Sequence, residues 1–189
     1  MAGVTDIPFR RQVKAFGGQY CVSEMVASDQ LARARIDMVR RAAGSGVISP
    51  LVIQLAGRDP AWMAEGARVA EAAGADVIDI NMGCPAKSVT SGLCGSALMR
   101  EPDHAMTLVE ATVNATKLPV TLKMRLGWDD KSLNAPEMAK RAEAAGVRML
   151  TIHGRTRSQF FRGVADWSAI APVVEAVSIP VIANGDIAT

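Results

Sequence analysis

Six apolar segments typical of β-strands recur along this chain, and segments with helical features separate them. The strands begin near residues 19, 51, 76, 119, 149 and 180, which is close to the length of about 30 residues for one strand–helix unit. Two of the helical segments end in the same four residues, Glu-Ala-Ala-Gly, at 71–74 and 143–146. Near-continuous apolar strands that alternate with helices form parallel sheets covered by helices. The sequence therefore predicts an α/β fold.

Polar residues close nearly every predicted strand, and they favour one of two kinds of parallel sheet. They are Ser23-Glu24, Gln54, Asn81 with Cys84, Lys123 with Arg125, His153 with Arg155, and Asn184 with Asp186. In a TIM (β/α)8 barrel all strand carboxyl ends meet at one mouth, which holds the active site. A doubly wound sheet places its site at one switch point instead. Because a whole barrel takes about 250 residues, we expect residues 1–189 to form an incomplete barrel that lacks its first and last strands.

The composition argues against several classes of protein. The formal net charge is only +2, so no polybasic tail indicates nucleic-acid binding. The three cysteines, Cys21, Cys84 and Cys94, form no CxxC pair, which argues against a zinc site and a disulfide framework. No apolar run approaches the roughly 20 residues needed to cross a bilayer. We expect a protein without a metal or a membrane partner, located in a reducing cytoplasm.

The clearest candidate for chemistry is Cys84. The apolar strand around Ile78 and Ile80 stops abruptly at Asn81, Gly83, Cys84 and Pro85, so a thiol lies where a strand ends and a loop begins. A cysteine thiol is mostly protonated at neutral pH and can serve as a general acid. The alternative is a small buried core residue, as cysteine often is. The position at a strand exit favours a functional role.

Three further side chains at strand ends have two readings each. Lys123 lies in an otherwise apolar strand, so it points into the mouth of the barrel or reaches solvent at the strand end. Gln54 can bind the edge of an imide ring or satisfy neighbouring backbone groups. A single histidine such as His153 is more often structural than catalytic.

Two groups of loop residues are candidates for phosphate binding. The loop Asn184-Gly185-Asp186 follows the strand that we count as the seventh of the barrel, and loops at this place commonly bind phosphate through backbone N–H groups. An ordinary Asn-Gly turn is the alternative. Basic residues also follow several strands and either meet phosphates or form a solvated rim; they are Lys87, Arg125, Arg155, Arg157 and Arg162.

Taken together, these motifs resemble the tRNA-dihydrouridine synthases, especially their bacterial B-type branch. The resemblance covers the whole chain in order. It rests on seven segments: Met1-Ala2-Gly3-Val4-Thr5-Asp6 with Pro8-Phe9-Arg10, Gln54-Leu55-Ala56-Gly57, Asn81-Met82-Gly83-Cys84-Pro85-Ala86-Lys87, Gly95-Ser96-Ala97-Leu98-Met99, Lys123-Met124-Arg125-Leu126-Gly127, His153-Gly154-Arg155-Thr156-Arg157 and Asn184-Gly185-Asp186.

The resemblance implies an FMN-binding TIM-barrel oxidoreductase that reduces the C5–C6 bond of particular uridines in tRNA. NADPH would reduce the flavin, the flavin would give hydride to C6, and Cys84 would give a proton to C5. Asn81 matches the position beside the target uracil, and Lys87 and Arg125 match positions near the RNA. The matches to flavin-contacting positions are Met1, Ala2, Gln54, Lys123, His153, Asn184, Gly185 and Asp186. We expect a monomer whose macromolecular partner is tRNA.

The chain departs from the family pattern in two ways, and two rival functions stay open. The family's C-terminal helical tRNA-binding domain is absent from this chain, and Ser88 stands where a second lysine is frequent. One rival is a flavin-dependent dehydrogenase of a free pyrimidine, against which the basic loop residues argue mildly. The other is a non-catalytic RNA-binding remnant, against which Cys84 and Lys123 argue.

Overall fold

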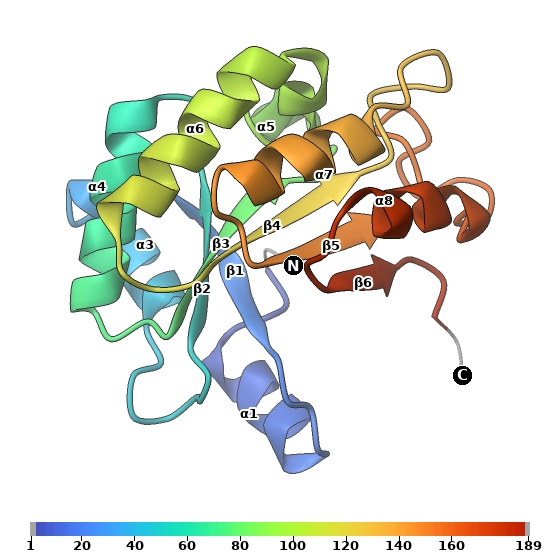
Figure 1. The fold of residues 1–189 in the computed structure, drawn as a ribbon. Helices are drawn as coiled ribbons and strands as arrows, with labels where there is room; N and C mark the ends of the chain where they lie inside the picture. Colours follow the sequence, from blue (N-terminus) through green and yellow to red (C-terminus); the bar gives the residue numbers. More distant parts are fainter. Residues whose placement is uncertain (1–2, 188–189) are drawn as a thin grey trace.

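Six parallel strands form a single sheet in which each strand pairs with its neighbour in the sequence (Figure 1). The structure is a computed structural model that describes residues 3–187. The strands are β1 (Val22–Ala27), β2 (Val52–Ala56), β3 (Val77–Met82), β4 (Val120–Arg125), β5 (Met149–His153) and β6 (Val181–Asn184).

Helix α1 (Ile7–Ala15) precedes the first strand, and the other helices connect successive strands. These are α2 (Ser28–Ala32), α3 (Ile36–Ala42), α4 (Pro60–Ala72), α5 (Lys87–Thr90), α6 (Pro102–Ala115), α7 (Ala135–Ala144) and α8 (Ala171–Ala176), with the 3₁₀ helices η1 (Gly95–Arg100) and η2 (Ser168–Ile170). Local signals explain several starts: the carboxylate of Asp59 caps α4 by accepting from the amides of Ala61 and Trp62, which satisfies donors that a helix leaves free.

The strand order distinguishes the two kinds of parallel sheet. It runs from β1 to β6 without a reversal, whereas a doubly wound sheet reverses its order at the switch point. Consecutive parallel strands, each followed by a helix, are the arrangement of a (β/α)8 barrel. Within the described residues β1 and β6 do not pair with each other. The predicted α/β fold is confirmed as part of a barrel.

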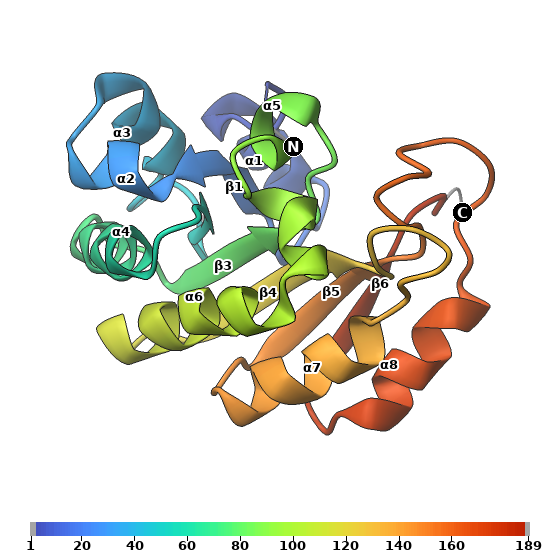
Figure 2. The same ribbon diagram turned by 90° about the horizontal axis from the view of Figure 1, so that it is seen from above.

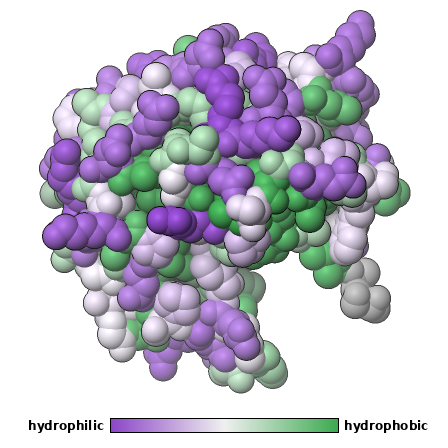
Figure 3. All heavy atoms as spheres, viewed as in Figure 1, coloured by the Kyte–Doolittle hydropathy of each residue, from purple (hydrophilic) through white to green (hydrophobic). Residues whose placement is uncertain are grey.

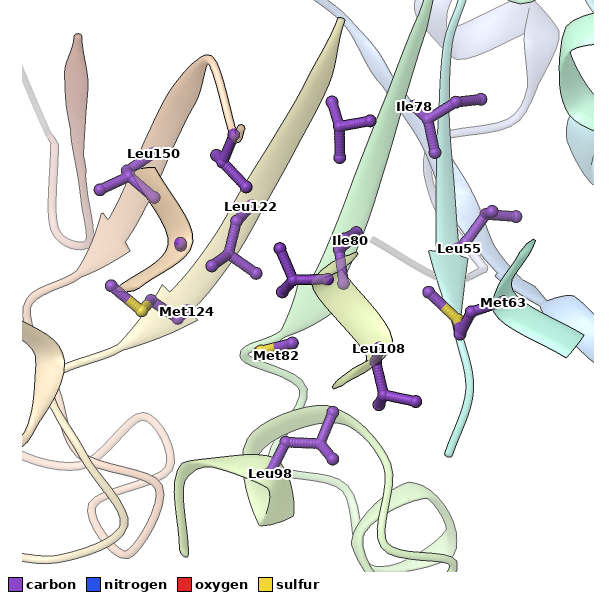
Figure 4. Close-up of a cluster of buried hydrophobic side chains, with 14 of the residues drawn as sticks. Leu55, Met63, Ile78, Ile80, Met82, Leu98, Leu108, Leu122, Met124 and Leu150 are labelled. Carbon is purple, nitrogen blue, oxygen red and sulfur yellow. The ribbon is translucent and has the colours of Figure 1, made fainter. Parts of the chain in front are cut away.

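Helices α4, α6, α7 and α8 line one side of the sheet, and α1 lies apart from them (Figures 1 and 2). The main apolar core fills the space between these helices and the strands. It includes Ile80, Leu122 and Leu150 from three neighbouring strands and Leu108 from α6 (Figure 4). Polar residues cover most of the outer surface seen in Figure 3, with apolar patches between them. The sheet therefore has one face that is buried under helices.

Some local predictions are wrong. The sequence predicts a short strand over residues 20–23, but the first strand is Val22–Ala27, so Ser23 and Glu24 lie near its start and not at its end. The sequence also predicts one helix from Ser28 or Asp29 to about Arg41. The structure divides this segment into α2 and α3, because Ala34 between them adopts a positive φ of 55°. Short helices α5 and η1 lie where no helix was expected.

No helix among residues 3–187 has both the length and the apolar character that crossing a membrane requires.

Candidate functional site

The predicted site residues that belong to strands lie on the face of the sheet opposite the helix-covered core. Successive side chains of a strand point to opposite faces, so Gln54 lies opposite its neighbours Ile53 and Leu55, which belong to the core. The register extends this face across the sheet: Gln54 pairs with Asp79, Asn81 with Lys123, Arg125 with His153, and His153 with Asn184. The structure thus brings groups from five consecutive strands onto one polar surface.

Asn81 connects this surface to the loop that carries Cys84. Its side-chain oxygen accepts hydrogen bonds from the backbone amides of Gly83 at 3.1 Å and Cys84 at 3.0 Å. Its amide nitrogen donates to the side-chain oxygen of Gln54 at 2.7 Å, and Gln54 donates in turn to Asp79 at 2.6 Å. The turn that presents Cys84 is therefore tied to the strand residues beside it.

A second contact fixes the Cys84 turn from the other side. Its carbonyl oxygen accepts from the backbone amide of Ser96 at 3.1 Å and from the Ser96 hydroxyl at 2.9 Å. A Cβ on Gly95 would lie 2.8 Å from this same oxygen, and Gly95 has a φ of 59°, so only glycine fits here without strain. The Cys84 side chain is partly exposed, which a proton donor to an outside molecule requires.

Lys123 supplies a positive charge in the middle of the polar surface. Burial and, to a smaller extent, the nearby guanidinium of Arg125 lower the pKa of its ammonium group to about 8, while Asp79 acts in the opposite direction. Near neutral pH the ammonium is therefore mostly charged, but it can lose its proton much more easily than an ordinary lysine.

His153 is held as a neutral imidazole with a defined tautomer. A guanidinium nitrogen of Arg155 lies 3.3 Å from its Nε2, and because a guanidinium only donates, Nε2 accepts and Nδ1 carries the proton. Arg155 also bonds both carboxylate oxygens of Asp186, at 2.7 and 3.0 Å. Burial lowers the pKa of His153 to about 4, with contributions from Arg125, Lys123 and Arg155.

Gly185 lies against this histidine. It has a φ of 113°, and a Cβ there would lie 2.8 Å from the His153 ring. Its neighbour Asp186 accepts from the backbone amide of Ala165 at 2.7 Å, and this bond together with Arg155 lowers the pKa of the Asp186 carboxyl. The loop 184–186 is thus fixed by its own contacts, and the absence of a side chain at Gly185 lets its backbone lie close to the His153 ring.

Arg125 is placed differently from the other predicted residues. It is only 1% exposed, and its guanidinium donates to the carbonyl oxygens of Gly83 at 2.8 Å, Thr156 at 2.9 Å and Phe160 at 2.8 Å. A direct contact with RNA would need these bonds to open. Lys87, by contrast, is exposed at the start of α5. The roles of both residues toward RNA stay predictions.

Met1 and Ala2, two predicted flavin-contacting positions, lie outside the described residues. Within the part of the chain that the structure describes, no group of three or more His, Cys, Asp and Glu side chains could hold a metal ion.

The roles of Asp79 and of Thr121, whose hydroxyl donates to Asp79 at 2.6 Å, were not predicted from the sequence. The signal that could have found them is an acidic residue inside an apolar strand.

The polar surface carries donors of the kind that a flat heterocycle with carbonyl oxygens and an anionic group would need. Gln54 and Asn81 offer amides, His153 offers an N–H donor, and Lys123 offers a positive charge. These donors suit the pyrimidine-type ring and phosphate of FMN, so the residues present fit that cofactor.

Comparison with known proteins identifies relatives over the whole chain. The family model described as "Dihydrouridine synthase (Dus)" matches residues 1–189. A "Probable tRNA-dihydrouridine synthase" of Rhizobium leguminosarum bv. phaseoli is 57% identical over 100% of this chain and 59% of its own length. The protein of the same name from Rhodobacter capsulatus is 60% identical over 99% of this chain and 58% of its own. The "tRNA-dihydrouridine synthase B" of Proteus vulgaris is 48% identical over 99% and 58%.

Two solved structures share the fold at low sequence identity. A "putative lyase/mutase" from Burkholderia cenocepacia J2315 has a TM-score of 0.60 and 18% identity, over 98% of this chain and 69% of that one. A phosphonopyruvate hydrolase in complex with oxalate and Mg²⁺ has a TM-score of 0.52 and 15% identity, over 98% and 74%. The chain spans 58–59% of the length of the dihydrouridine synthases named above. With the match over its full length, the chain belongs to the dihydrouridine synthase family.

Proposed function

We propose that the protein containing this chain reduces specific uridines of tRNA to 5,6-dihydrouridine, with FMN as cofactor and NADPH as reductant. The proposal rests on the convergence of Gln54, Lys123 and His153 on one polar surface. Cys84 lies beside them, on the loop directly after β3. The printed names of the relatives supply the class of substrate.

The flavin side of the site comes from the strands β2, β4, β5 and β6. Gln54 would hold the pyrimidine edge of the ring, and Lys123 would supply a positive charge beside it. His153 would donate from Nδ1, and it stays neutral above pH 5 because its pKa is about 4. Asn184, Gly185 and Asp186 form the loop that would hold the phosphate. FMN, when bound, supplies the hydride.

The uridine side of the site comes from β3 and its loop. Asn81 offers an N–H group to a carbonyl oxygen of the uracil, and the Cys84 thiol donates its proton to C5 while hydride is added to C6. One hydride and one proton saturate the C5–C6 bond without a further reactant. The uracil would have to leave its stack to reach this surface. Lys87, which is exposed, would contact the RNA backbone.

The remaining part of the relatives' length suggests what else the whole protein holds. We propose that residues 1–189 are part of the FMN-binding catalytic barrel and that a helical tRNA-binding domain lies in the rest of the protein. A monomer in the cytoplasm is the state that we predict, and light scattering of the full-length protein would test the oligomeric part.

The test is replacement of Cys84 by Ala in the full-length protein. Loss of a general acid is expected to lower dihydrouridine formation on unmodified tRNA by about 10²–10⁴-fold, with flavin absorbance unchanged. Cys94→Ala is the matched control and should keep its activity, because the Cys94 thiol donates to the nearby carbonyl of Gly92 and is assigned no part in the reaction. Undiminished turnover in Cys84→Ala would contradict the assigned acid, and turnover of free uracil without tRNA would favour a dehydrogenase of free pyrimidines.

A further inference from the structure

Asp79 is a buried carboxyl group that the proposed mechanism does not use. It lies in the middle of β3 between Ile78 and Ile80, and it is only 3% exposed. Its two oxygens accept one hydrogen bond each, from the Gln54 amide nitrogen at 2.6 Å and from the Thr121 hydroxyl at 2.6 Å. A buried acidic group is costly unless it is well bonded, so its presence in a strand needs a reason.

The bonds of Asp79 determine which way two amide side chains point. Because a carboxylate only accepts, Gln54 must turn its nitrogen toward Asp79. Its oxygen then faces Asn81, which has to offer its own nitrogen, as observed at 2.7 Å. The Asn81 oxygen is left for the Cys84 turn, where it accepts two backbone hydrogen bonds. One carboxyl group thus orders a directional chain that ends at Cys84.

The other end of the chain imposes the same direction. The backbone amides of Gly83 and Cys84 can only donate, so they require the Asn81 oxygen independently of Asp79. The orientation of side-chain amides is assigned from such networks, and here two fixed ends agree. Reversal of either amide would place a donor against a donor.

We propose that Asp79 is a positioning residue that fixes the polarity of Gln54 and Asn81, so that each presents one free N–H group to the carbonyl oxygens of a pyrimidine-type ring. An amide nitrogen carries two hydrogens, and the chain Asp79–Gln54–Asn81 uses one from each. The free N–H of Gln54 serves the flavin and that of Asn81 serves the uracil. This assignment rests on the proposed function.

The polarity does not depend on whether Asp79 is ionised. Burial raises the pKa of its carboxyl, and the nearby ammonium of Lys123 acts against this. If the oxygen that faces Thr121 is protonated, its O–H group can donate a hydrogen bond to the Thr121 hydroxyl. The Thr121 hydroxyl then donates its own hydrogen to Tyr20, whose oxygen lies 3.2 Å away. The oxygen that faces Gln54 still accepts.

Three variants of the full-length protein separate polarity from charge and from stability. Asp79→Leu removes the acceptor for Gln54 and is expected to lower FMN affinity about tenfold or more, because a buried donor loses its partner. Asp79→Asn keeps an acceptor toward Gln54 and is expected to stay within about threefold of the wild type. Thr121→Val, the matched control, removes the other bond of Asp79 and should also stay within about threefold.

A second readout follows the Cys84 end and needs no flavin. The rate of iodoacetamide alkylation of Cys84, relative to that of Cys94 in the same molecule, should change severalfold in Asp79→Leu and stay constant in Asp79→Asn. If Asp79→Leu does not fold, Gln54→Glu should change this ratio, because two carboxyl groups then face each other, and Gln54→Glu with Asp79→Asn should restore it.

The outcomes are distinct. A folded Asp79→Leu protein with wild-type FMN affinity and a wild-type alkylation ratio would overturn the proposal. So would an Asp79→Asn protein as impaired as Asp79→Leu, since charge and not polarity would then matter. If the wild type binds no FMN, the proposed function fails, while the alkylation ratio still tests the polarity.

Discussion

The two faces of the sheet are built from alternate residues of the same strands but follow different physical rules. On the face under the helices, Ile80, Leu122 and Leu150 are almost wholly buried and bear no polar group. On the opposite face, Asp79 and Lys123 alternate with them and interact through hydrogen bonds and charge. The first face depends on shape and volume, and the second depends on the direction of each donor and acceptor.

The apolar face is expected to contribute mainly to stability, and the polar face mainly to ligand binding. Loss of volume on the apolar face leaves a cavity, which costs stability. On the other face, a buried charge is costly to the fold. Removal of a polar group that makes no internal hydrogen bond should therefore weaken ligand binding and change the free energy of unfolding little. Arg125 is the exception on the polar face, since its guanidinium bonds only backbone oxygens.

Arg125→Leu should give the largest loss of stability and thereby break a simple division between the faces. Two buried carbonyl oxygens and one partly buried carbonyl oxygen lose a charged donor, so we expect the free energy of unfolding to fall by about 4 kcal/mol. Urea denaturation of the full-length protein measures it. Arg148→Leu at an exposed position is the control and should change stability by less than about 0.5 kcal/mol. An equal effect of both variants would show that the three bonds are dispensable.

Leu122→Ala tests the apolar face. Leu122 is 0% exposed in the centre of the sheet, and removal of its side chain should lower the free energy of unfolding by about 3 kcal/mol through lost contacts and a residual cavity. Flavin affinity should not change below the unfolding transition, because the side chain points away from the polar surface. A lower affinity in the folded variant would mean that the two faces are coupled.

The sequence predicted the elements whose signals are local. The sequence predicts strands over 120–125 and 149–153, which are the bounds observed for β4 and β5. Each segment contains recurring apolar residues and shortly follows the end of a predicted helix. The extension of β1 to Ala27 was missed, since it depends on pairing with β2, as Ala27 with Ala56 shows. Such a contact joins residues far apart in the chain and leaves no local pattern.

The same distinction holds for the candidate site. Gln54, Lys123 and His153 could be proposed because each is a polar residue at the end of an apolar strand. The position of Asp79 between Gln54 and Thr121 could not, because its partners lie 25 and 42 residues away. A list of candidate residues can therefore be read from the sequence, whereas the direction of each hydrogen bond needs the fold.

Lys123→Met sharpens the contrast, because its effect should fall on binding and not on stability. The ammonium is costly to bury, as its lowered pKa of about 8 indicates, so we expect the free energy of unfolding to change by less than about 1 kcal/mol. The FMN affinity of the wild type should fall as the pH rises through 8, since the charge that attracts the anionic cofactor is lost. Fluorescence titration at several pH values measures this, and an identical pH dependence in Lys123→Met would contradict the assignment.

His153 should give the smallest effect, which appears only as a slope of stability against pH. Its pKa is about 4 in the folded chain against an ordinary value of 6.5, so between these values the unfolded chain binds a proton that the folded chain does not. Stability from this group is complete above pH 6.5 and declines as the pH falls toward 4. Asp and Glu residues titrate in the same pH range. The wild type and His153→Gln share these residues, so the two proteins differ only in the contribution of the histidine. Urea denaturation at pH 7 and pH 5 should therefore show a smaller decline for His153→Gln than for the wild type, by less than about 1 kcal/mol after solvent screening. Equal declines would mean that burial and the neighbouring cations do not hold the imidazole neutral, and the tautomer assigned to it would then have no support.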